Sequence, residues 1–123
     1  MEFGAHLPLM DFGGHPYSWE HLSSFTSLAR ELGFRAVAAN DHLVFPVPWL
    51  DGPTALAAVI GDSGSMTLAT TVALPTVRGP VALAKTLAAI DLLSGGRLVA
   101  AVGPGSSPRS VWSWPGSPTR PGG

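Results

Sequence analysis

Residues 79–105, GPVALAKTLAAIDLLSGGRLVAAVGPG, decide the fold class of this chain. Pro80 suits the first turn of a helix, and one of the two glycines after Ser94 can take the left-handed conformation that closes it. Residues 97–102 are almost entirely apolar, which is typical of a parallel strand covered on both faces. A helix, a short turn and such a strand form the repeating unit of parallel α/β folds. The apolar face of the helix, over residues 81–93, comprises Leu83, Leu87, Ile90 and Leu93.

The preceding part of the chain repeats this order of elements. Ser18 can cap the first helix and Gly33 ends it. Strands are expected over residues 3–9, 35–39 and 66–74, and helices over residues 18–32 and near residues 53–60. The buried stripe of the first helix comprises Leu22, Phe25, Leu28, Ala29 and Leu32. The order is therefore βαβαβαβ, and right-handed crossovers lay the four strands side by side in parallel.

Composition excludes several classes of protein. The chain has 123 residues, 46% apolar and 12% charged, which suits one domain. A net charge of −1 without a basic run argues against nucleic acid or an anionic membrane as partner. No cysteine is present and the four histidines lack metal-ligand spacing, so we expect neither a disulfide nor a metal site. We expect a cytoplasmic protein, because no signal peptide and no apolar run of about 20 residues is found.

The last part of the chain differs from the rest. Residues 106–123 are rich in Ser, Pro and Gly, and four prolines forbid a continuous helix. We therefore expect a domain over residues 1–105 and an irregular tail over residues 106–123. A natural disordered tail is one explanation. Our hypothesis is the other, an interrupted reading frame that has removed the rest of a larger barrel.

Five segments, in this order, resemble the N-terminal half of the luciferase-like monooxygenase superfamily. The resemblance extends over about residues 1–109 and implies the first half of a (β/α)8 barrel. It also implies an oxidoreductase or monooxygenase that acts on a small molecule with reduced flavin (FMN) or the deazaflavin coenzyme F420. The segments are FGAHLP, ELGFRAVAANDHLVFP, DGPTALAAV, LATTVALPTVRGPVALAKTLAAIDLLSGGRL and AVGPGSSPR.

The resemblance assigns roles to residues at the carboxyl ends of the strands, where barrel enzymes place their chemistry. His42 takes the position of a histidine that transfers protons beside the flavin ring, a task that suits imidazole. Asp41 then contacts the cofactor or orients the imidazole. A purely structural interpretation stays open, in which Asp41 caps the next turn and His42 is a loop histidine. His6 should face the barrel mouth, more often as a satisfied histidine than as a ligand contact.

Two further strand ends are candidates for cofactor binding. Thr71 and Val72 match a kink, in some members a non-proline cis peptide, that bulges against the flavin ring; an ordinary buried strand is the alternative. Gly103 and Ser106 follow the last strand, where small residues allow close approach or merely turn the chain. Ser106 stands where the sugar-phosphate dehydrogenase branch has a proton-transferring glutamate.

Two functions are compatible with these residues. The first is a luciferase-like oxidoreductase in which His42 handles protons. The second is a non-catalytic half-barrel, either inactive as an isolated fragment or completed by association with another chain. Because four strands leave two open sheet edges and an uncovered apolar interior, we expect self-association.

Overall fold

Four parallel strands form a single sheet in the order β1-β2-β3-β4. The computed structural model describes residues 1–11, 13–14 and 17–105. The strands are β1 Gly4–His6, β2 Ala36–Ala39, β3 Thr67–Ala73 and β4 Leu98–Val102. The helices are α1 Trp19–Glu31, α2 Gly52–Ala58, α3 Pro75–Arg78 and α4 Pro80–Leu93. The predicted βα repeat and its parallel pairing are confirmed, and the expected tail lies outside the described residues.

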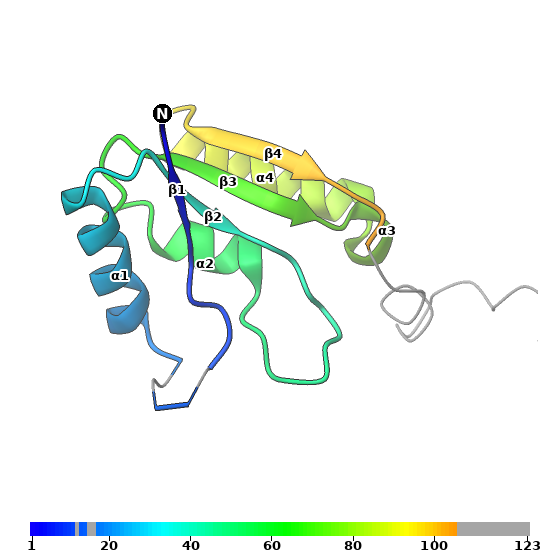
Figure 1. Ribbon diagram of the computed structural model, residues 1–123. Coiled ribbons are helices and arrows are strands. Elements are labelled where there is room, and N and C mark those ends of the chain that lie inside the picture. Colours follow the sequence, from blue (N-terminus) through cyan, green and yellow to red (C-terminus); the bar gives the residue numbers. More distant parts are fainter. Residues whose placement is uncertain (12, 15–16, 106–123) are drawn as a thin grey trace, which may run out of the picture.

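One face of the sheet carries the helices and the other face is open (Figure 1). The core lies between the sheet and the helix layer. Its fully buried side chains include Leu7, Leu9, Val37, Leu56, Val59 and Leu68. This arrangement is the first half of a (β/α)8 barrel, in which the helices surround the strands.

The predicted helix boundaries have the expected chemistry. Ser18 Oγ accepts a hydrogen bond from the His21 backbone N–H at 3.1 Å, which caps α1. Gly33 ends that helix with a φ of 85°. Gly95 and Gly96 both have positive φ, 70° and 81°, where the sequence required one such residue.

The first strand is shorter than predicted. We expected residues 3–9, but the regular strand is Gly4–His6. The Leu7 N–H still donates to the Ala38 carbonyl at 2.8 Å, and then Pro8 interrupts the ladder because it has no N–H to donate.

Helix α3 was missed in the sequence. It has four residues, too few for a periodic apolar pattern. Pro75 begins it, and Gly79, with a φ of 84°, separates it from α4. This proline and this glycine are the start and stop signals that could have revealed it.

Three leucines predicted to be buried are instead exposed. Leu28 on α1 and Leu32, the residue after α1, are 53% and 68% exposed, and Leu93 on α4 is 72% exposed. Helices α1 and α4 lie at the two ends of the helix layer, so each lacks a neighbour on one side. The expectation that residues 97–102 are covered on both faces is also wrong. One face of the sheet is open, and Val99 and Val102 of β4 are exposed.

Gly52 lets the start of α2 approach the end of β2. A Cβ at this position would overlap the Asn40 carbonyl oxygen. We expect Gly52→Ala to lower the free energy of unfolding by about 1–3 kcal/mol or more, the usual cost of overpacking. Urea unfolding followed by circular dichroism measures this. The control is Gly61→Ala, where a Cβ meets nothing within 4 Å; an equal loss in both variants would contradict the steric explanation.

Candidate functional site

A buried carboxylate joins the carboxyl ends of β2 and β3. Asp41 follows β2 closely and is 4% exposed. Its carboxylate accepts hydrogen bonds from the Leu74 N–H at 3.1 Å and from Nε and Nη2 of Arg78 at 2.6 Å each. Leu74 follows β3, and Arg78 is the last residue of α3. Asp41 thus fixes two strand ends and a short helix relative to one another.

The same guanidinium also binds Asp51, the N-cap residue of α2. Asp51 accepts hydrogen bonds from the Thr54 N–H at 3.0 Å and from the Thr54 hydroxyl at 2.5 Å. We call Asp41, Asp51 and Arg78 the arginine cluster. The hydrogen bonds to Asp41, against the effect of burial, raise the pKa of Arg78 above its ordinary value. Burial alone would raise the pKa of Asp51, but the hydrogen bonds from Thr54 and Arg78 outweigh it and lower that pKa.

His42 is held by aromatic packing. Its ring centroid lies 4.6 Å from that of Phe45 and 4.6 Å from that of Trp49. Trp49 is itself oriented by a hydrogen bond of 3.0 Å from its Nε1 to Asn40 Oδ1. Within the described part of the chain, neither ring nitrogen of His42 is hydrogen-bonded. The imidazole is therefore positioned while both nitrogens stay available for proton transfer.

His6 differs from His42 because both of its ring nitrogens are engaged. Nε2 accepts the Asn40 N–H at 3.2 Å, so Nδ1, which lies 2.8 Å from the Leu7 carbonyl oxygen, carries the proton in the neutral ring. His6 lies at the carboxyl end of β1 and ties it to the residue after β2. It is the satisfied histidine that the sequence favoured, although its side chain is exposed and lies outside the core.

The end of β3 is irregular where the sequence indicated a kink. The pairing with β4 shifts register between Thr70 and Ala73, and the peptide bond between Thr71 and Val72 is cis. Thr71 and Val72 are both exposed, so the alternative of an ordinary buried strand is wrong here. A Cβ on Gly103 would lie 2.9 Å from Val72 Cγ2, so the kinked strand end and this glycine fit against each other.

The structure thus brings some of the predicted site residues together and leaves others apart. Val72 and Gly103 meet, whereas the bonds of Asp41 go to Leu74 and Arg78 and not to His42. The residue predicted at position 106, Ser106, lies outside the described residues. Sequence reasoning missed Arg78 and Asp51, although Asp51-Gly52-Pro53 has the pattern of an N-cap followed by a helix start.

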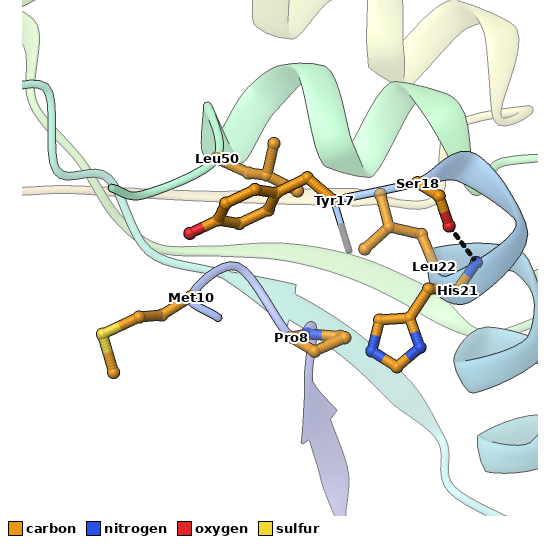
Figure 2. A pocket seen from close by; sticks show the side chains of 7 residues that line it. All are labelled: Pro8, Met10, Tyr17, Ser18, His21, Leu22 and Leu50. Carbon is orange, nitrogen blue, oxygen red and sulfur yellow. Dashed lines mark hydrogen bonds between the residues drawn. The ribbon is translucent and has the colours of Figure 1, made fainter. Parts of the chain in front are cut away.

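Two hollows lie beside α1, and Asp51 of the arginine cluster lines the wider one. Figure 2 shows seven side chains, Tyr17 and His21 among them, around a hollow of about 10 Å³ beside α1, room for about one water molecule. A wider cleft of about 280 Å³ lies between α1 and α2, beside Trp19 and Leu22. None of the predicted site residues lines either space.

Among the described residues, no helix has the length and apolar character needed to cross a membrane. No group of three or more metal-ligating side chains was found in the same part of the chain.

We expect Arg78→Ala to lower the free energy of unfolding by about 3–5 kcal/mol, because it leaves the buried Asp41 carboxylate without its cation. Denaturant unfolding measures the loss. The control is Arg35→Ala, which removes an exposed ion pair with Glu2 at 3.4 Å and should cost about 1 kcal/mol or less. Similar losses in the two variants would show that the arginine cluster contributes no more than a surface pair.

The lowered pKa of Asp51 predicts a pH dependence. Its contribution to stability is present above the ordinary value of 3.8 and is lost as the pH falls through the lower value of the folded state. Asp51→Asn should therefore weaken the fall in stability below about pH 4, and Thr54→Val, which removes one donor, should act in the same direction but less. Unfolding curves measured from pH 3 to pH 7 test this; an unchanged profile in Asp51→Asn would contradict it.

Comparison with known proteins gives relatives of one kind. The F420-dependent glucose-6-phosphate dehydrogenase of Microbacterium testaceum (strain StLB037) is 36% identical to this chain, over 98% of this chain and 37% of that protein. The structure of the monooxygenase RslO1 from Streptomyces bottropensis matches with a TM-score of 0.74 and 32% identity, over 88% of this chain and 34% of that chain.

A third relative supports the fold alone. The FMN-bound oxygenating constituent of 3,6-diketocamphane monooxygenase from Pseudomonas putida has a TM-score of 0.74 at 20% identity, over 89% of this chain and 31% of that chain. The chain spans about a third of the length of these relatives. Residues 1–114 match the family described as luciferase-like monooxygenase, a range that includes every strand and helix of the structure. This chain therefore belongs to the luciferase-like monooxygenase family.

Proposed function

We propose that this chain carries the proton-transfer part of an oxidoreductase site that uses reduced FMN or F420. The observation that carries the proposal is the placement of His42, a half-buried imidazole between Phe45 and Trp49 with both nitrogens available. The relatives support the choice of cofactors, since one is named F420-dependent and another is in complex with FMN. The proposal includes both cofactors because these relatives differ in the one they use.

The residues present fit a planar ring at the end of β3. Thr71 and Val72 are exposed at the register shift, and Gly103 beside them has no side chain to obstruct an approaching ring. We assign these three residues to one face of the cofactor ring. When bound, a reduced flavin or deazaflavin supplies a hydride or activates oxygen.

The side chains around the ring would then have separate tasks. His42 donates or accepts the proton at a ring nitrogen, while Phe45 and Trp49 orient the imidazole. Asp41 acts as a positioning residue, because its carboxylate already accepts three N–H donors and holds the two strand ends in place. Ser106 has no carboxylate to transfer a proton, which leaves His42 as the proton carrier in this proposal.

We expect His42→Ala to slow the redox half-reaction about 10²-fold or more, the usual contribution of a general acid or base, and to change cofactor binding less. The measurement is stopped-flow absorbance of the cofactor in a barrel whose first half is this chain. His6→Ala is the matched control. It should lower stability but leave the rate within a few-fold, because both nitrogens of His6 are engaged by the backbone. Equal rates in wild type and His42→Ala would remove His42 from the mechanism.

The second candidate function is a non-catalytic half-barrel. It is favoured by the sheet of the described residues, which has four strands and stays open. In barrels of this kind the phosphate part of a ligand is held mostly by the loops after strands seven and eight.

We therefore expect the 123-residue chain alone to retain neither FMN nor F420 at micromolar concentration, an affinity that needs about 8 kcal/mol. Absorbance after gel filtration tests this. A stoichiometrically loaded preparation would contradict it and would show that four strands, or an assembly of them, complete the site.

A further inference from the structure

The cleft of about 280 Å³ between α1 and α2 has no role in the proposed function. Its volume lies near the lower end of the range of small-molecule sites, and most of its lining is apolar, as is usual for such sites. None of His42, Thr71 and Val72, which we assign to the redox site, lines it. The lining residues are Tyr17, Ser18, Trp19, Leu22, Leu50, Asp51, Thr54, Ala55 and Ala58.

One end of the cleft carries a negative charge. Asp51 is the only charged side chain among the described residues that line it. In the arginine cluster two carboxylates share one guanidinium, and within the described part of the chain neither aspartate pairs with a second cation. The side chain of Asp51 is 42% exposed, whereas that of Asp41 is 2% exposed. The charge that Arg78 cannot neutralise is therefore accessible at Asp51, on the wall of the cleft.

The Asp51 carboxylate can accept one more hydrogen bond. An ionised carboxylate has about four acceptor positions, two on each oxygen. Oδ2 accepts the N–H and the hydroxyl of Thr54, whereas Oδ1 accepts Nη2 of Arg78 and makes no second bond to a described residue. A donor from a ligand can bind at Oδ1, and a positively charged donor makes the stronger bond.

The other end of the cleft is apolar and aromatic. Ala58 is the last residue of α2, and Trp19 Nε1 donates to its carbonyl oxygen at 3.3 Å. This bond holds the indole beside the end of the helix, where it can pack against another aromatic ring. A helix rises about 1.5 Å per residue, so Asp51 and Ala58 lie roughly 10 Å apart along α2. A ligand that contacts both ends has about this length.

We propose that this cleft binds an arylalkylammonium ion, a small organic cation with an aromatic ring. The ammonium group donates to Asp51 Oδ1, and the ring lies against Ala58 and Trp19. Asp51 would repel an anion, and a cation without a ring would leave the apolar walls in contact with water. The cleft is thus a binding site separate from the one that we assign to the cofactor.

The first test compares three probes on the unmodified chain. They are phenethylammonium, its neutral analogue phenethyl alcohol, and methylammonium, which has the charge without the ring. Titration followed by amide NMR spectra should give a Kd of roughly 0.1–1 mM for phenethylammonium, a usual affinity for so small a ligand. We expect binding about tenfold weaker or less for each of the other two, because each lacks one of the two contacts. The shifted signals should include the indole N–H of Trp19 and the amides of Thr54 and Ala55.

Three outcomes of this titration would overturn the proposal. They are no binding up to about 10 mM, equal binding of phenethylammonium and phenethyl alcohol, and shifts confined to His42 and Trp49. The titration needs no cofactor, so its outcome and that of the test of the proposed function are independent.

A pair of variants tests the charged end. Asp51→Asn keeps a side chain that can cap α2 and removes the charge. It should weaken the binding of phenethylammonium about tenfold and change that of phenethyl alcohol by about twofold or less. Glu31→Gln is the control, because it removes an exposed carboxylate from the end of α1, outside the cleft. It should leave both affinities unchanged, and an unchanged affinity for phenethylammonium in Asp51→Asn would contradict the assignment of Asp51.

A second pair tests the apolar end and does not alter the arginine cluster. Ala58→Leu fills the space beside Trp19 and should weaken the binding of both aromatic probes. Ala57→Leu adds the same side chain at an exposed position of α2 that does not line the cleft, so it should weaken neither. Equal effects of the two leucine variants would show that the ligand lies elsewhere.

Discussion

One guanidinium holds the carboxyl edge of the sheet together. Arg78, at the end of α3, binds Asp41 from the end of β2 and Asp51 from the start of α2, and Asp41 also takes the N–H of Leu74 after β3. Charges removed from water stabilise a fold only when all their hydrogen bonds are made, so these four segments must adopt their positions together. His42 follows Asp41 directly, and its backbone is fixed by this cluster.

The elements that the sequence predicted are those with local signals. Helix α4 has its proline, its apolar repeat and its terminal glycines within one short stretch, so neighbouring residues determine its limits. Helix α3 has too few residues for a repeat, and the partners of Arg78 lie 37 and 27 positions away. A local sequence pattern does not extend over separations of 27 or 37 residues. The arginine cluster could therefore be recognised only in the folded structure, whereas the βα order could be predicted from the sequence.

The apolar repeat of a helix shows which of its sides is apolar. It does not show whether a neighbouring element covers that side. Leu28, Leu32 and Leu93 follow the repeat and are nonetheless exposed, because their helices end the layer. The same limit applies to the site. His6 and His42 both follow strand ends, and only their surroundings separate a histidine bonded through both nitrogens from one held by aromatic rings.

The large sequence separation between Arg78 and Asp41 also affects the order in which the chain can fold during its synthesis. Asp41 and Asp51 leave the ribosome before their cation, and at about 5–20 residues per second Arg78 follows Asp41 by roughly 2–7 s. During that interval burial of the Asp41 carboxylate is unfavourable, because its cation is not yet present. The ends of β2 and β3 therefore lock together late, and the nascent chain keeps this edge open until α3 has emerged.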